Sequence, residues 1–237
     1  MTEFLFRDDS YLRSTPATVV ALTEEGGIVL DRTVFYATSG GQPGDSGRLE
    51  RADGTSLEIE VAVHPDGDKT AIVHVPANGE ARLETGEPIV ASVDWDRRLK
   101  LMRMHTALHL VTVILPFPIT GAAVGEDKGR VDFNMPETPG APEVIEERLN
   151  ALVEAALPVS SEWITEAELE ANPGLMKSMN VKPPIGQGRV RLIRIGDVDL
   201  QPCGGTHVAN TLEIGPLRLG KIEKKGAINR RVSVLFG

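Results

Sequence analysis

The sequence predicts an α+β fold in two parts, a small all-β part over residues 1–94 and an α+β part over residues 95–237. In the first part, short apolar runs are separated by glycine-containing turns, a pattern typical of a β-barrel. In the second part, segments of helical periodicity alternate with strand-like runs, which favours packed layers of helix and sheet. A chain of 237 residues can bury one large core or two small ones.

The predicted elements follow the apolar pattern along the chain. The predicted barrel strands cover residues 18–22, 27–30, 57–63 and 70–75, with turns at residues 25–27, 53–54 and 66–67. A helix is predicted between Asp94, a natural N-cap, and Pro116, which can end it. A strand is then expected over residues 129–133, and later strands include one over 189–195. Between them Pro142 opens a second helix, whose predicted buried face contains Ile145, Leu149, Leu152 and Ala156.

The first predicted helix contains the earlier of two short motifs with candidate metal ligands. His105 and His109 are four residues apart, so they lie on one face of a helix and can bind the same ion. The later motif, QPCGGTH over residues 201–207, contains Cys203 and His207. Its two central glycines are expected to adopt backbone conformations closed to other residues, so that a tight turn brings both side chains inward.

Together the two motifs predict a zinc site. Imidazole and thiolate are the ligands that zinc prefers. Each pair alone has an ordinary structural explanation, but the motifs contain the only cysteine of the chain and three of its five histidines. The other two, His64 and His74, lie in strand-like stretches without neighbouring ligands and are interpreted as structural.

The type of zinc chemistry is not fixed by these ligands. Common zinc peptidases have a glutamate directly after the first helical histidine, whereas Thr106 occupies that position here, which argues against a peptidase. Four protein ligands fill a tetrahedral shell, as in structural zinc sites, while catalysis needs an open or fifth position.

The motifs resemble those of the editing domains of alanyl- and threonyl-tRNA synthetases and of free-standing alanyl-tRNA editing proteins. HTALH over residues 105–109 and CGGTH over 203–207 carry the resemblance, and residues 191–203 and 208–215 extend it on both sides. Residues 35–47 resemble the glycine-rich motif of the family's N-terminal barrel. The resemblance therefore covers nearly the whole chain.

The resemblance implies a deacylase with two domains, a barrel over residues 1–94 and a zinc-binding editing domain over 95–237. Such an enzyme hydrolyses the ester between a wrongly attached amino acid, chiefly serine and sometimes glycine, and the terminal ribose of tRNA(Ala). The implied ligands are His105, His109, Cys203 and His207, with the zinc site between a helix and a glycine-rich loop. The catalytic group is a zinc-associated water without a separate general base, and whether zinc activates this water or anchors the substrate is open.

Further residues are expected at the substrate. Because the site must accept serine and spare alanine, it needs a polar group for the serine hydroxyl. The resemblance places Thr120 near such a position, and it places the glycine-rich loop at the editing site, although these glycines can also simply permit turns. The predicted substrate-binding residues are Thr120, Gly40, Gly41, Gln42 and Asp45. Ser39 stands where the family more often has glycine.

Charge is distributed unevenly along the chain. The net charge is −9, but nine glutamates against one arginine between residues 137 and 170 account for most of it. Two basic clusters flank the motifs, and solvation of the surface and phosphate binding are comparable interpretations for them. The predicted tRNA-binding residues are Arg97, Arg98, Lys221, Lys224, Lys225, Arg230 and Arg231.

The remaining expectations concern location and rival functions. No run of about 18 apolar residues could span a bilayer, and the N-terminus lacks the order of a secretory signal, so no membrane contact is predicted. A single thiol in a metal site indicates a reducing compartment, the cytoplasm. Because a synthetase adenylation domain does not fit in this length, the chain is expected to act alone. The rival functions are a deacylase of mischarged tRNA(Thr) and a non-catalytic tRNA- or protein-binding module with structural zinc.

Overall fold

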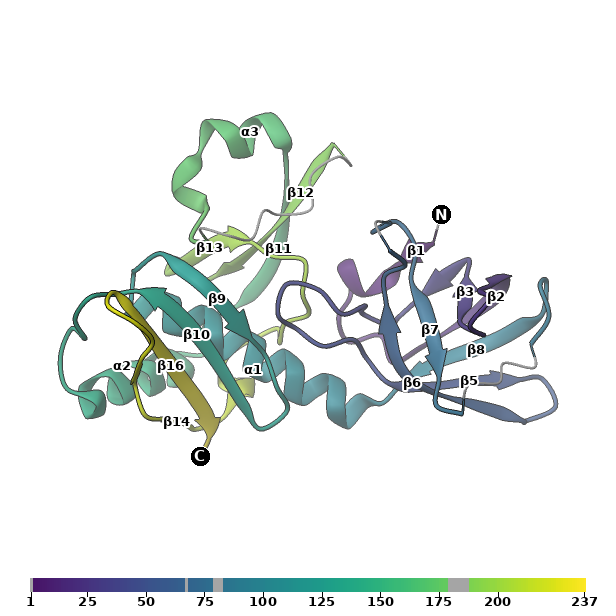
Figure 1. The fold of residues 1–237 in the computed structure, drawn as a ribbon, viewed down its shortest axis with the longest axis horizontal. Coiled ribbons are helices and arrows are strands. Elements are labelled where there is room, and N and C mark those ends of the chain that lie inside the picture. Colours follow the sequence, from purple (N-terminus) through teal and green to yellow (C-terminus); the bar gives the residue numbers. More distant parts are fainter. Residues whose placement is uncertain (1, 67, 79–82, 179–187) are drawn as a thin grey trace. The chain divides into compact units, whose positions relative to one another are not determined.

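A computed structural model describes residues 2–66, 68–78, 83–178 and 188–237 of the chain. The fold is α+β and consists of two compact units, Met1–Leu99 and Lys100–Gly237. The division between the units falls within the first helix, a few residues after the predicted boundary at residue 94. Each unit has its own sheets (Figure 1).

The first unit is a closed six-stranded barrel, as the apolar pattern predicts. Its strands, in spatial order, are β2 (Ser14–Leu22), β3 (Ile28–Leu30), β7 (Val73–Pro76), β6 (Ser56–Val63), β5 (Gly47–Arg51) and β8 (Pro88–Val93), and β8 pairs with β2 to close it. A short parallel pair joins β1 (Glu3–Phe4) to β4 (Arg32–Thr33). Alternate strand residues such as Val19, Leu30 and Leu49 point inward and are almost fully buried, because side chains alternate between the two faces of a strand.

Within its described residues, the second unit has one long helix and two antiparallel sheets. The helix is α1 (Trp95–Ile114). One sheet contains β14 (Leu217–Leu219), β16 (Asn229–Phe236), β10 (Lys128–Asn134) and β9 (Ile119–Ala123) in that order, and β15 (Glu223–Lys224) also pairs with β16. The other contains β11 (Val159–Thr165), β12 (Arg189–Ile195) and β13 (Asp199–Pro202). The remaining helices are α2 (Pro142–Glu154) and α3 (Glu166–Ala171).

Two close contacts fix the first sheet of this unit. Gly129 of β10 lies against α1, where an added Cβ would come 2.7 Å from the Met104 sulfur, so a larger residue would push the strand away from the helix. At the β14 edge of the sheet, Asn150 of α2 donates to the Leu217 carbonyl at 2.8 Å and accepts from the Leu217 amide at 2.9 Å. The α2 side chain thereby satisfies the free edge of β14.

Some predicted elements need correction. The second helix buries Ile145, Leu149 and Val153, not the predicted Leu152 and Ala156. The helix ends at Glu154, and Ala156 lies beyond it with φ 51°. The fourth predicted barrel strand begins at Val73 rather than residue 70, and Gly67 of the predicted turn at 66–67 lies outside the described residues. The basic C-terminal segment forms β15 and β16, which the charge pattern did not indicate.

Candidate metal centre

Helix α1 presents the first two ligands. The Asp94 carboxylate accepts a hydrogen bond of 3.2 Å from the Arg97 amide, which confirms Asp94 as the N-cap. One turn separates His105 from His109, and their ring centroids lie 5.3 Å apart. Both side chains are buried, with residue exposures of 8% and 6%. The helix face therefore offers two imidazoles away from bulk water, as the spacing predicts.

The loop after β13 presents the other two ligands, but not through the predicted glycine conformations. Neither Gly204 nor Gly205 has a positive φ, so this expectation was wrong. Instead the buried guanidinium of Arg191 donates to the carbonyls of Cys203, at 3.2 Å, and Gly205, at 2.8 Å. The Gly205 amide lies 3.4 Å from the Cys203 sulfur. A cross-strand arginine thus holds the turn that aims the thiol.

The four predicted ligands converge. One donor atom from each of His105, His109, Cys203 and His207 lies within 4.8 Å of the others. The Cys203 sulfur is 3.5 Å from Nε2 of His105 and 3.3 Å from Nε2 of His207. A tetrahedral zinc ion with Zn–S of about 2.3 Å and Zn–N of about 2.0 Å places sulfur and nitrogen about 3.5 Å apart. The donor set therefore fits zinc in chemistry and in spacing.

Charges within the cluster favour the ligand forms of two side chains. Burial raises the pKa of Cys203, but the charges of His105 and His207 outweigh it and hold this pKa well below its ordinary value. Burial, followed by the charge of His105, lowers the pKa of His207 to about 3. Burial also lowers the pKa of His109, but the Asp199 carboxylate and Cys203 raise it to about 9. A thiolate and a neutral imidazole are the forms that bind metal.

Two histidines of the cluster are oriented by neighbours that the sequence analysis did not select. The Thr106 hydroxyl donates to the Met102 carbonyl at 2.9 Å, so it must accept the hydrogen bond of 3.1 Å from Nδ1 of His207. Asp199 accepts from Nδ1 of His109, also at 3.1 Å. A signal for Asp199 was present, because residues 199, 201 and 203 alternate along one strand and so share a face.

The predicted substrate loop of the barrel is partly an internal structure. Gly40 and Gly41 have φ values of 57° and 87°, which favour glycine. Gln42 is fully buried, as is Asp45, whose carboxylate accepts from the Tyr36 amide at 2.6 Å and from Nε of Arg98 at 2.9 and 3.0 Å. Asp45 therefore holds the loop in place, rather than contacting substrate as the sequence analysis expected.

The predicted tRNA-binding residues divide into buried and exposed groups. Arg98 is 0% exposed and also donates to the Val34 carbonyl at 2.6 Å, so it does not reach a surface phosphate as its charge had suggested. Arg97 is held by the Gly44 carbonyl. In the C-terminal cluster, Lys221 and Lys224 are exposed.

The other C-terminal basic residues have partners within the second unit. Arg231 binds the Asp132 carboxylate at 2.8 and 2.9 Å. Arg230 donates to the Asn229 and Pro136 carbonyls. Lys225 lies 2.7 Å from Glu223. Thr120, the candidate for the serine hydroxyl, is half-buried on β9 and donates to the Asp132 carbonyl at 3.1 Å.

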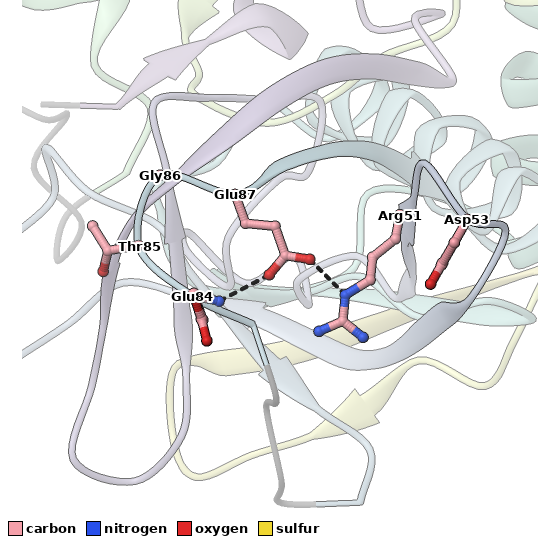
Figure 2. A pocket seen from close by; sticks show the side chains of 6 residues that line it. All are labelled: Arg51, Asp53, Glu84, Thr85, Gly86 and Glu87. Atoms are coloured by element: carbon pink, nitrogen blue, oxygen red, sulfur yellow. Dashed lines mark hydrogen bonds and ion pairs between the residues drawn. The ribbon is translucent and has the colours of Figure 1, made fainter.

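A polar cavity on the barrel was not expected from the sequence (Figure 2). It is lined by Arg51, Asp53, Glu84, Thr85, Gly86 and Glu87. One carboxylate oxygen of Glu87 lies 2.6 Å from Nε of Arg51, and the other accepts from the Glu84 amide at 2.9 Å. These contacts link β5 to the turn before β8. Across the described parts of the chain, no helix combines the length and apolarity needed to cross a membrane.

The chain is similar to known proteins over nearly its whole length. Residues 190–233 match the second additional domain of threonyl- and alanyl-tRNA synthetases, and residues 12–97 match the class II (A) tRNA synthetases. Both units thus have counterparts in tRNA synthetases. The alanyl-tRNA editing protein AlaX-M of Methanosarcina acetivorans is 35% identical over 98% of both chains, and that of Saccharolobus solfataricus is 33% identical over 98% of both. This chain belongs to the AlaX-M family of alanyl-tRNA editing proteins.

A longer relative contains a similar sequence within a larger protein. The alanine–tRNA ligase of Pyrobaculum aerophilum is 36% identical over 94% of this chain, which corresponds to 25% of the ligase. The similarity therefore covers both units of this chain but only a quarter of that ligase.

Proposed function

We propose that this chain is a trans-acting deacylase that hydrolyses the ester of mischarged tRNA(Ala), chiefly the serine ester, with the glycine ester as a second substrate. The observation that carries this proposal is similarity over 98% of both chains to proteins named for alanyl-tRNA editing. The buried cluster of four ligands supports a reaction at a metal ion. A tRNA substrate also supports the expected cytoplasmic location.

We assign His105, His109, Cys203 and His207 to one zinc ion. When bound, zinc would supply positive charge that polarises a water molecule or the substrate. The chain's own residues hold the ligands in place and keep the cluster largely out of bulk water. Asp199, the carboxylate beside the cluster, is occupied by His109, which supports a mechanism with water as the attacking group and without this residue as general base.

We assign the choice of amino acid to Thr120 and to the loop around Gly40 and Gly41, with Gln42 and Asp45 supporting that loop. The Thr120 hydroxyl donates to a backbone carbonyl, and a hydroxyl can both donate and accept hydrogen bonds, which suits the serine hydroxyl. The positive φ angles at residues 40 and 41 favour glycine, so the loop has no side chain at either position. Loss of the hydrogen bond to Thr120 penalises a substrate that lacks the hydroxyl.

We assign tRNA phosphate contacts to Lys221 and Lys224, with Arg97, Lys225, Arg230 and Arg231 in supporting positions. Lys221 and Lys224 are exposed, and Lys225 is exposed as well but pairs with Glu223. Hydrogen bonds within their own units hold Arg97, Arg230 and Arg231. Binding of phosphates by lysines does not depend on the nucleotide sequence, and its affinity falls as the salt concentration rises.

Deacylation of charged tRNA tests the proposal. Purified protein should release serine from tRNA(Ala) about 10⁴-fold faster than alanine, because a pocket that bonds the hydroxyl discriminates to this degree. Thr120→Val should reduce this ratio, and Thr55→Val, at an exposed turn of the barrel, should leave it unchanged. Equal rates for the serine and alanine esters would refute an editing function, since such an enzyme would destroy the correct product.

One rival function has a structural observation in its favour. Four protein ligands complete a tetrahedral shell, which is the habit of structural zinc. A non-catalytic module would bind tRNA without releasing serine, and the same assay detects this outcome. Serine release from tRNA(Thr) but not from tRNA(Ala) would instead identify the other rival, a deacylase of mischarged tRNA(Thr).

A further inference from the structure

The Asp199 carboxylate sits at the centre of a buried polar network beside the metal cluster. Its side chain is 0% exposed. One oxygen accepts from Nδ1 of His109, at 3.1 Å, and from Nε2 of Gln201, at 2.8 Å. The other oxygen is paired with the Lys177 ammonium. A buried carboxylate with three donors is fixed in position, and so is the imidazole that it holds.

Thr112 connects the same network to the backbone of the helix. Its hydroxyl donates to the His109 carbonyl at 2.8 Å, so its oxygen is the acceptor for Lys177 at 3.3 Å and for Gln201 at 3.2 Å. His109 is thereby held at its ring by Asp199 and at its backbone carbonyl by Thr112, which lies one turn further along the helix. The network draws on α1, on β13 and on Lys177, which lies shortly after the 3-10 turn Pro173–Leu175.

The orientation of the ring follows from these contacts. An imidazole that donates through Nδ1 presents Nε2 on the opposite side of the ring. For His105 and His207 it is Nε2 that faces the Cys203 sulfur. An equivalent arrangement for His109 lets all three histidines offer the same nitrogen to one ion.

We propose that Asp199, held in place by Lys177 and Gln201, is a positioning residue that fixes His109 with Nε2 toward the metal ion. The inference rests on the proposed zinc centre of the editing function. Neighbours of this kind usually contribute 10- to 100-fold, roughly, to metal affinity. Lys177 acts on His109 only through Asp199. Its removal should therefore weaken zinc binding less than removal of the Asp199 charge does.

The test measures zinc affinity of the full chain by competition with a chelator. Asp199→Asn should weaken zinc binding by about 10- to 100-fold, Lys177→Met should weaken it several-fold, and Lys177→Arg should restore most of the loss. Glu162→Gln is the matched control, because Glu162 pairs with Arg194 on the adjacent strands at an exposed position away from the cluster. That control should bind zinc as wild type does.

Two further readouts separate positioning from other roles. In the zinc-loaded protein, the Nδ1 proton of His109 should give a downfield NMR signal that moves in Asp199→Asn, and the visible spectrum of the cobalt-substituted protein should change with it. If Asp199→Asn fails to fold, Lys177→Met, at a side chain that is 27% exposed, carries the test. A raised KM with unchanged zinc affinity in Lys177→Met would overturn the inference for Lys177 and make it a substrate contact.

The failure of this inference is distinguishable from failure of the proposed function. Unchanged zinc affinity and an unchanged His109 signal in Asp199→Asn would overturn the positioning role while serine release by wild type continued. Zinc binding by wild type without serine release would refute the editing function and leave the positioning role intact. Absence of zinc binding in wild type would overturn both.

Discussion

His74 of the barrel and His207 of the second unit are both buried histidines, yet their surroundings differ in one respect. The two ring nitrogens of His74 are both used by protein groups, Nδ1 by the Ile28 carbonyl at 3.0 Å and Nε2 by the Thr33 hydroxyl at 2.8 Å. In His207, Nδ1 bonds Thr106, while Nε2 faces the Cys203 sulfur at 3.3 Å. A ligand histidine is therefore recognised by a ring nitrogen that faces other ligands, and not by its burial.

The largest expected effect concerns the cluster. Cys203→Ala should reduce bound zinc from about one ion per chain to near zero and abolish serine release, because three imidazoles without the thiolate hold zinc far more weakly. His74→Gln should keep the zinc. Elemental analysis of both purified variants checks this. Full zinc occupancy in Cys203→Ala would show that the Cys203 thiolate is not needed for the metal site.

The second effect concerns the barrel. His74→Ala should destabilise the protein by about 2–4 kcal/mol, because it opens a cavity and leaves the Thr33 hydroxyl and the Ile28 carbonyl without their partner. Chemical denaturation of wild type and variant measures the loss. His64→Ala, whose residue is half-buried and bonds the Ala71 carbonyl, is the milder control and should cost less.

A pH dependence sharpens the contrast. Burial lowers the pKa of His74 to about 4, from 6.5 in the unfolded chain. As the pH falls, the unfolded state therefore binds the proton before the folded state does. The contribution of neutral His74 to the unfolding free energy is complete above about pH 6.5 and is lost as the pH falls toward 4. The loss amounts to about 3 kcal/mol. The difference in unfolding free energy between wild type and His74→Gln, measured from pH 7 to 4.5, isolates it, and a constant difference would contradict the assignment.

The smallest effect lies outside both histidine sites. The double variant Lys221→Ala with Lys224→Ala should weaken tRNA binding and lower the salt dependence of log Kd by about 1–2, since each lost phosphate contact releases one counterion fewer. The rate at saturating tRNA should stay the same. Binding titrations at several salt concentrations check this, with Lys69→Ala on the barrel as control. An unchanged slope would remove these lysines from the tRNA contacts.

The sequence was sufficient for the ligands and insufficient for what supports them. His105 and His109 could be predicted because helical spacing fixes their relation, and Cys203 and His207 because they share one short motif. The partners Asp199 and Lys177 could not be paired from the sequence, because they are 22 positions apart and a strand lies between them.

The same limit explains the wrong expectations. The Arg98–Asp45 ion pair joins residues 53 positions apart, so a residue chosen for its charge proved to be fully buried. In the second predicted helix, Leu152 and Val153 are both apolar, and only the packing of its last turn decides which one is buried. At the Cys203 loop, glycine composition suggested a special backbone, whereas a distant arginine supplies the support.

The contact between Asn150 and Leu217 has a consequence for self-association. Exposed edge strands offer unpaired amides and carbonyls to other chains, and proteins prevent this by covering them. Asn150 occupies both backbone groups of Leu217, and Glu146 accepts from the Leu219 amide at 2.7 Å. Helix α2 thus takes the place of the strand that would otherwise extend the sheet. Growth of this sheet by addition of a second copy is therefore blocked along β14.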